Sequence, residues 1–259
     1  MVFDVPLAIP RPGLLPSWMR VTGFVDIHCH LIAGIDDGPK DNQQTRALID
    51  AARSAGIAAI VATPHFSSRY DLDCADRDAR LALAERIAED VPLLFAGCEL
   101  ELTEERLVQF FRNPRRYTLN GSRYSLVELP HNAGGASLDR AARLFRDRGL
   151  RPILAHPERY PFLPPDSPAL SAWIANGGLL QATAASFTGR MGRRAKAAAF
   201  ELLSRNALHL IASDAHDAVK RGPDMREAFA AVAAASDVHL AGRLFTHNPL
   251  SVVRDELLG

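Results

Sequence analysis

Two histidines separated by one residue, His28 and His30, lie in a short apolar stretch that spans 24–30. If this stretch is a β-strand, alternate side chains share a face, so both imidazoles point the same way, together with the carboxylate of Asp26. Neutral imidazole is the commonest protein ligand of metals, which makes the pair half of a candidate metal site. Histidine pairs also pack in cores with satisfied hydrogen bonds, so further ligands must come from elsewhere in the chain.

More histidines and acids follow other short apolar stretches. Each stretch has the length and composition of a buried strand, and each polar residue comes where the stretch ends. Imidazoles and carboxylates without a thiolate suit Mn(II), Fe(II) or Zn(II), and they are too many for one ion. We therefore predict two or three ions that activate a water and hold a phosphate or carbonyl oxygen, with Asp26 holding an imidazole in its tautomer. The further candidate ligands are His65, Glu99 (or Glu101 on the same face), Glu128, His156, Asp214 and His216.

Seven predicted strands alternate with predicted helices. Their near-continuous apolar character indicates a parallel sheet that is buried on both faces. A closed barrel brings the carboxyl ends of its strands around one mouth, whereas an open sheet spreads them along a line. Because the candidate ligands end six different strands, we predict an α/β fold with one distorted TIM-like (β/α)7 barrel. The predicted strands span 24–30, 57–62, 91–97, 124–127, 152–155, 179–183 and 208–212, and the predicted helices span 41–55, 71–90, 104–112, 138–148, 168–176, 190–205, 224–235 and 250–257.

Length and composition exclude several other classes of function. The chain has 259 residues, of which 47% are hydrophobic, and its 30 basic and 30 acidic residues give a formal net charge of zero. Nucleic-acid and anionic-membrane binders carry a clustered basic excess, so neither partner is predicted. No stretch approaches the roughly 18 charge-free apolar residues of a membrane span. Three widely spaced cysteines fit a reducing, cytoplasmic location better than a disulfide framework.

Two segments and two further histidines are not assigned to the metal site. Residues 1–23 contain four prolines and are predicted to form an irregular arm before the domain at 24–259. The segment from Cys74 to Arg80 spells C-x5-R, as in cysteine phosphatases, but it has no glycine and lies in helical sequence, so we interpret it as a chance match. His209 alternates onto the face opposite Asp214 and is interpreted as a packing residue, and His131 lies off the ligand pattern but near the predicted mouth.

Seven short motifs follow one another from Phe24 to the C-terminus. They are His-Cys-His, Asp-Asp-Gly, Thr-Pro-His, Gly-Cys-Glu, Val-Glu-Leu-Pro, Ala-His-Pro-Glu-Arg-Tyr and Ala-Ser-Asp-Ala-His. In this order and at these intervals, the chain resembles the PHP (polymerase and histidinol phosphatase) superfamily. It is most similar to the bacterial tyrosine-protein phosphatases of the CpsB and YwqE type, from capsule and exopolysaccharide operons. One departure is Cys29, which stands where relatives often have serine, and no ligand is missing.

The resemblance implies a specific site and reaction. A metal-bound hydroxide would attack the phosphorus of phosphotyrosine, and Arg159 and Arg221 would bind the phosphate. The substrate would be the tail of a membrane-associated bacterial tyrosine kinase, and the ions would be Mn(II), with Fe or Zn as alternatives. The implied ligand sets are His28, His30, Glu99 and Asp214 for the first ion, Glu99, Glu128 and His156 for the second, and Asp37, His65 and His216 for the third.

Three alternatives remain open from the sequence. The nearest is a phosphatase of the same superfamily that acts on histidinol phosphate or another small phosphomonoester. An amidohydrolase barrel also begins with H-x-H, but many such enzymes bridge their metals with a carboxylated lysine, and none of Lys40, Lys196 and Lys220 ends a predicted strand. The third alternative is an inactive metal-binding scaffold for a kinase, which would be expected to lack a ligand.

Overall fold

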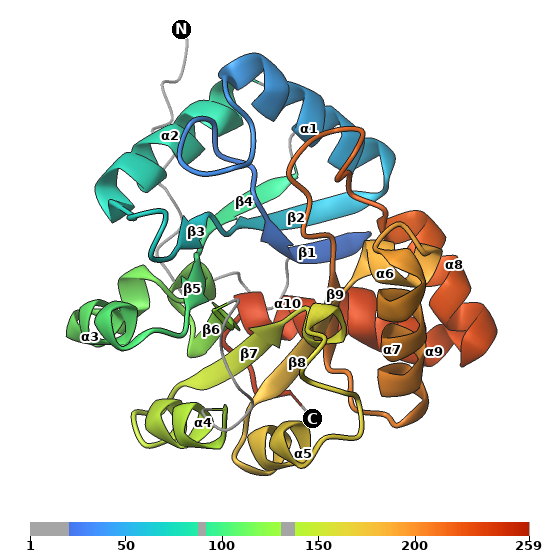
Figure 1. Cartoon of the computed structure of the whole chain (residues 1–259). Helices are drawn as coiled ribbons and strands as arrows, with labels where there is room; N and C mark the ends of the chain where they lie inside the picture. Colours follow the sequence, from blue (N-terminus) through green and yellow to red (C-terminus); the bar gives the residue numbers. More distant parts are fainter. Residues whose placement is uncertain (1–20, 88–91, 131–137, 259) are drawn as a thin grey trace, which may run out of the picture.

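The described strands all run parallel, in the two sheets β1-β2-β4 and β3-β5-β6-β7-β8-β9 (Figure 1). The computed structural model describes residues 21–87, 92–130 and 138–258, and the statements below concern these residues. The arm predicted at 1–23 therefore lies almost entirely outside the described residues. The strands are β1 (Phe24–Cys29), β2 (Ile57–Ala62), β3 (His65–Phe66), β4 (Leu93–Ala96), β5 (Glu99–Glu101), β6 (Tyr124–Glu128), β7 (Arg151–Ala155), β8 (Leu179–Thr183) and β9 (Leu210–Ala212).

Two of the seven barrel strands are interrupted. β2 and β3 are halves of one strand, as are β4 and β5, because one pairing register runs through both halves, from Ala62 opposite Ala96 to His65 opposite Glu99. At the carboxyl ends of the strands, β5 pairs with β6. At the amino ends, β4 does not pair with β6, and the 3-10 turn Leu119–Gly121 contacts both strands instead. This missing pairing between β4 and β6 is the distortion of the barrel.

The ring closes between the first and last strands. Cys29 pairs with Ala215 in a parallel bridge. The Asp214 N–H donates to the His28 carbonyl at 2.8 Å, and the His30 N–H donates to the Ala215 carbonyl at 2.8 Å. Seven strand segments thus surround one axis, which confirms the predicted (β/α)7 barrel.

The barrel separates two hydrophobic cores. The inner core includes Val25, Ile27 and Leu126 from the strands, together with Val252 and Val253 from the last helix, α10 (Asn248–Val253). That helix lies behind the ring in Figure 1 and closes the amino end of the barrel. The outer core lies between the strands and the surrounding helices. With apolar side chains on both sides of the strands, the buried histidines and acids lie at the carboxyl ends of the strands.

Most of the longer helices overlap the ranges predicted from the sequence, and several are capped by a side chain. The Asp41 side chain caps α1 by accepting from Gln44 N–H at 2.9 Å, and Ser167 caps α5. Short α6, α9 and the π-helical turn Arg243–His247 were not predicted, because one or two turns give no readable period. No described helix is long and apolar enough to cross a membrane. The remaining helices are α1 (Asn42–Ser54), α2 (Cys74–Ile87), α3 (Glu104–Arg112), α4 (Leu138–Arg146), α5 (Pro168–Ala175), α6 (Ala184–Thr188), α7 (Gly192–Ser204), α8 (Met225–Ala235) and α9 (Val238–Gly242).

Candidate metal centre

An irregularity in β1 directs the two central histidines toward the mouth. Between Asp26 and Cys29, three steps along β1 match only two steps along β2, so the strand carries one extra residue. Ile27 consequently packs in the inner core and Cys29 in the outer core, although strict alternation would put them on one face. His28 and His30 both lie buried among the acids of the mouth.

Asp26 does not have the role that the sequence predicts for it. Its carboxylate accepts hydrogen bonds from the backbone N–H of Ser213, at 2.9 Å, and from the Ser213 hydroxyl. These bonds join β1 to the end of β9. The prediction that Asp26 holds an imidazole is wrong, because the extra residue in β1 breaks the alternation on which it rested.

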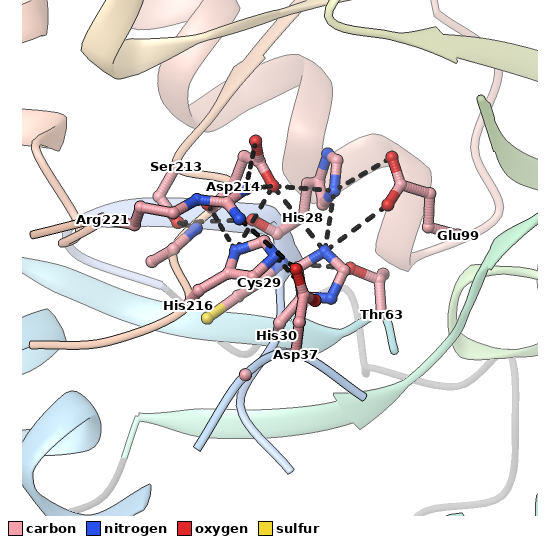
Figure 2. A network of polar contacts seen from close by, with 12 residues as sticks. His28, Cys29, His30, Asp37, Thr63, Glu99, Ser213, Asp214, His216 and Arg221 are labelled. Atoms are coloured by element: carbon pink, nitrogen blue, oxygen red, sulfur yellow. Dashed lines mark hydrogen bonds and ion pairs between the residues drawn. The ribbon is translucent and has the colours of Figure 1, made fainter. Parts of the chain in front are cut away.

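The first group of ligand-type side chains is completely buried and tightly packed (Figure 2). His28 Nε2 lies 3.3 Å from Glu99 Oε1 and 3.4 Å from Asp214 Oδ1. His30 Nε2 lies 3.5 Å from Glu99 Oε2, 3.6 Å from Asp214 Oδ1 and 3.3 Å from His28 Nε2. Two imidazoles and two carboxylates from β1, β5 and the end of β9 therefore converge on one small volume.

Glu99 also contacts a second group. Its Oε1 lies 3.0 Å from His156 Nε2, and its Oε2 lies 3.1 Å from His65 Nδ1. Glu128 Oε1 lies 3.1 Å from the same nitrogen of His65. His65, Glu99 and Glu128 offer ligand atoms within 4.8 Å of one another, a set that pairs Glu128 with His65. Glu99 has the central place expected of a bridging carboxylate.

Asp37 joins a third group at the outer edge. Its Oδ1 lies 3.2 Å from His216 Nε2 and 3.5 Å from His65 Nε2. The ring of His216 stacks on that of His30 with centroids 3.8 Å apart. Together the four residues offer ligand atoms within 4.8 Å of one another. Every residue of the implied ligand sets thus lies in one continuous cluster, whereas the alternative Glu101 belongs to none of these groups and accepts the Ser68 N–H at 2.8 Å.

Two residues that the sequence analysis missed hold the central imidazoles. His28 Nδ1 lies 2.9 Å from Gln181 Oε1, and His30 Nδ1 lies 2.7 Å from Asp36 Oδ2. Both contacts leave Nε2 facing the cluster, which is how outer partners fix the tautomer of a metal ligand. Gln181 could have been noticed as the polar residue within the apolar strand 179–183, and Asp36 as the first acid of Asp-Asp-Gly.

Two of the candidate ligands have left-handed backbone conformations. His156 has φ of 41° and Asp214 has φ of 53°, and each follows directly or closely on a strand end. Such conformations are uncommon outside glycine and carry local strain. The surrounding hydrogen bonds, His156 N–H to the Gln181 carbonyl and Asp214 N–H to the His28 carbonyl, both 2.8 Å, hold the strained residues in place.

Two arginines lie over the cluster. Arg159 pairs with Asp214, and Arg221 Nη2 lies 3.3 Å from Asp214 Oδ2 (Figure 2). Arg221 Nη1 also lies 3.6 Å from Asp37 Oδ2. Both arginine side chains are about one-third exposed, so a ligand from solvent can reach them.

A cavity of about 550 Å³ opens above the cluster and the arginines. Tyr70 stands on one side, with its ring nearly parallel to that of His65 and 5.6 Å from it. Tyr160 and Phe162 also line the cavity, with ring centroids 5.5 Å apart. The cavity therefore combines a polar floor with aromatic walls.

The side-chain nitrogens fit a set of metal ligands. His65 Nδ1, His156 Nδ1 and His216 Nε2 are buried and make no hydrogen bond within the described part of the chain. Burial, together with the positive charge of Arg159, lowers the pKa of His156 to about 4, so its imidazole is neutral at pH 7 and keeps a free lone pair. Burial disfavours the charged form of His30, but Asp36 and Glu99 outweigh it and raise its pKa to about 9. The same negative field attracts a metal cation.

Cys74 and His209, which were not assigned to the metal site, lie outside the cluster. Cys74 begins α2, its buried thiol contacts the Arg116 carbonyl, and burial raises its pKa, so the chance interpretation of C-x5-R holds. His209 Nδ1 accepts from the Leu180 N–H at 3.2 Å, as expected of a packing residue. His131 lies outside the described residues.

Comparison with known proteins gives a consistent match over most of the chain. The family model described as capsular polysaccharide synthesis, CpsB/CapC, matches residues 24–254. Tyrosine-protein phosphatase YwqE of Bacillus subtilis is 33% identical over 212 residues, which cover 79% of this chain and 82% of the relative. Tyrosine-protein phosphatase CpsB of Streptococcus pneumoniae is 27% identical over 245 residues, which cover 91% of this chain and all of the relative.

The fold gives two further likenesses. A solved structure described as YwqE from Bacillus subtilis and CpsB from Streptococcus pneumoniae, unique metal-dependent tyrosine phosphatases, superposes with a TM-score of 0.82 and 28% identity, and covers 91% of this chain and 96% of that one. A 2-pyrone-4,6-dicarboxylic acid hydrolase from Acinetobacter baumannii superposes with a TM-score of 0.55 and 13% identity over 90% of this chain and 99% of that one. The second likeness concerns the fold alone.

Proposed function

Because this chain belongs to the CpsB/CapC family of capsular polysaccharide synthesis, we propose that it is a metal-dependent protein-tyrosine phosphatase. The relatives that carry this name match the chain over most of their own length. We further propose that residues 24–259 form the phosphatase domain and that 1–23 are an arm outside it, since the family match begins at Phe24.

The observation that carries the proposal is the convergence of imidazoles and carboxylates beneath two arginines. Acids and histidines from six strand ends meet within hydrogen-bonding distances of one another, although they are far apart in sequence. A structural cluster of this kind costs folding free energy, because it buries like charges together. This cost is explained if the cluster is a functional site that binds cations and then an anion.

We assign two to three divalent ions to the cluster, with Mn(II) as the expected metal and Fe or Zn as alternatives. Bound divalent ions would supply a nucleophilic water at neutral pH and positive charge for the phosphate oxygens. The proposed ligands are His28, His30, Asp37, His65, Glu99, Glu128, His156, Asp214 and His216.

Arg159 and Arg221 are proposed to bind the phosphoryl group. Each presents a partly exposed guanidinium beside Asp214, so a phosphate that enters the cavity meets two planar forks that donate paired hydrogen bonds. Tyr70 and Phe162 line the same cavity and offer apolar surface to a phenyl ring. A phosphotyrosyl side chain therefore matches both the floor and the walls.

The proposed protein substrate is the phosphorylated tail of a membrane-associated bacterial tyrosine kinase that controls capsule or exopolysaccharide synthesis. This follows from the family description and from the phosphatase names of the relatives. A phosphatase for such a tail would act at the cytoplasmic side, in agreement with the three free cysteines.

The test measures hydrolysis of a phosphotyrosyl peptide and of histidinol phosphate by the full chain loaded with Mn(II). We expect turnover of the peptide, loss of that activity after chelation, recovery on adding Mn(II), and no loss after thiol alkylation. Activity that survives chelation but not alkylation would refute the metal-dependent mechanism. Preference for histidinol phosphate would replace the proposed substrate, and no activity with full metal content would favour the inactive scaffold.

A further inference from the structure

A second cavity, of about 340 Å³, opens beside the cavity of the metal centre. Its lining residues come from α6, from the segment before α7, from the segment that follows β9 and from Arg159. Arg159, Asp214 and Arg221 line both cavities, so a phosphoryl group held by the two arginines sits at the boundary between them. The volume is sufficient for one further side chain of a bound peptide. The other lining residues are Ala185, Arg190, Met191, Ser213, Lys220 and Gly222.

The lining of this second cavity is strongly basic. Lys220 and Arg190 add two positive charges to those of Arg159 and Arg221, against Asp214 in the lining and Asp224, which pairs with Arg190. Asp214 already faces both shared arginines. The Lys220 ammonium makes no ion pair with any described residue, and it lies at the surface where a ligand can reach it.

The new basic side chains are carried by ordered backbone. Asp217 Oδ1 accepts the N–H groups of Val219 and Lys220 at 2.7 and 2.6 Å, which fixes the turn that carries Lys220. Arg190 is held by Asp224 at the start of α8, with Nη1 and Oδ1 2.7 Å apart. The Arg190 guanidinium is therefore positioned before a ligand arrives, and binding an anion costs it little conformational entropy, whereas for Lys220 it is the backbone that is fixed.

The opposite side of the metal-centre cavity has a different charge. Glu101 and Glu128 line it there, with Arg69 as the one basic residue on that side. A peptide that binds across the mouth therefore meets acids on one side of its phosphotyrosine and bases on the other. Such a charge asymmetry determines which peptide sequences bind and in which direction, and it contributes less to the binding affinity itself.

We propose that the second cavity is a subsite for another anionic group of the same substrate, a carboxylate or a second phosphoryl group near the phosphotyrosine that is hydrolysed. The subsite uses Arg190 and Lys220 as its own recognition residues. This inference rests on the proposed function, since it takes a phosphotyrosyl protein as the substrate, and it adds that the substrate is acidic or multiply phosphorylated beside the target tyrosine.

The test compares phosphotyrosyl peptides with the full Mn(II)-loaded chain. One series carries a single glutamate at each of the three positions before and after the phosphotyrosine, a second series carries glutamine there, and a third carries a second phosphotyrosine. The measured quantity is the ratio of kcat/KM between each charged peptide and its glutamine match. The variant is Arg190→Gln with Lys220→Gln, and the control is Arg46→Gln with Arg205→Gln, which removes two exposed, ion-paired arginines elsewhere.

We expect at least one charged position to raise kcat/KM by roughly three- to tenfold through a lower KM, in line with two partly exposed charge pairs. The preference should fall to near unity in the Arg190/Lys220 variant, persist in the control and weaken at high salt. A preference for the glutamate series identifies a carboxylate ligand, and a preference for the third series alone identifies a phosphoryl ligand. Equal rates for charged and neutral peptides, or a preference that survives in the variant, would overturn the subsite while leaving the phosphatase intact. If no peptide is hydrolysed, the proposed function itself fails.

Discussion

Asp36 offers the sharpest test of how the metal centre is held together. Its Oδ2 lies 2.7 Å from His30 Nδ1 and accepts the His65 N–H at 3.0 Å, while Oδ1 accepts the Gly38 N–H at 2.9 Å. If His30 binds metal through Nε2, its Nδ1 carries a proton, so Asp36 receives three donors and gives none. Asp36→Asn keeps the shape but replaces one acceptor oxygen with a donor NH2 group.

The substituted amide cannot satisfy this arrangement in either orientation. With its NH2 group toward His30, two donors face each other, and with its NH2 group toward Gly38, the same conflict moves to the backbone. Loss of such an outer partner typically weakens metal binding or activity by about 10- to 100-fold, which corresponds to about 1.4–2.8 kcal/mol. We therefore expect the Mn(II) affinity of Asp36→Asn to fall by this factor, with much of the rate recovered at saturating metal.

The assay is calorimetric titration with Mn(II), paired with kcat/KM for an aryl phosphate as a function of Mn(II) concentration. Asp41→Asn is the matched control, since it makes the same chemical change five residues away at the cap of α1, where asparagine caps as well as aspartate. If Asp36→Asn bound Mn(II) within twofold of the parent, Asp36 would not be an orienting partner of a ligand, and the assignment of His30 to the metal would lose its main support.

Three other predictions follow from single residues. His156→Ala should lower the turnover of an aryl phosphate at least about 100-fold with an unchanged far-UV circular dichroism spectrum, and a normal rate would remove His156 from the ligand set. Arg221→Lys should raise KM for the phosphate ester about tenfold at equal metal content, because an ammonium cannot reproduce the paired hydrogen bonds of a guanidinium; an unchanged KM would contradict its phosphate contact. Burial and the charge of Arg151 lower the pKa of His209 from 6.5 to about 4, so the unfolded chain binds the extra proton first and stability falls as the pH drops from 6.5 toward 4, by at most about 3 kcal/mol. His209→Asn should make that slope shallower in denaturant titrations of the metal-free protein, where His156, with a pKa of about 4, adds a slope of the same sign, and exposed His239→Asn should leave the slope unchanged.

The barrel and the convergence of most residues of the candidate site could be predicted, because the ends of strands can be recognised in the sequence. Apolar runs such as 57–62 and 179–183 stop abruptly, and polar residues that follow parallel strands must meet at one edge. The observed strand 179–183 and helix 104–112 coincide with their predicted bounds. The α2 helix begins at Cys74, three residues after the predicted start at 71, and its predicted end at 90 lies outside the described residues.

What the sequence could not predict depends on small departures from regular geometry. The extra residue in β1 turns Asp26 toward β9, and no local signal marks it. Gln181 contacts His28 across a separation of 153 residues, which no local pattern predicts. Asp36 is only six residues from His30, but the two meet through an irregular loop that has no readable period. Glu128 lies with His65, and its assignment to the second ion with His156 stays a prediction.

The balance of charge at the mouth depends on whether metal is bound. When the histidines are neutral, as metal ligands must be, five carboxylates against two guanidinium groups leave three negative charges for the ions to balance. Two divalent ions turn this excess into one net positive charge, and three ions turn it into three. Bound ions would therefore supply positive charge for a phosphate monoester dianion in addition to a nucleophilic water, whereas in the metal-free chain the acids raise the pKa of His30 to about 9, so that protons balance part of the negative charge. The five carboxylates are those of Asp36, Asp37, Glu99, Glu128 and Asp214, and the guanidinium groups are those of Arg159 and Arg221.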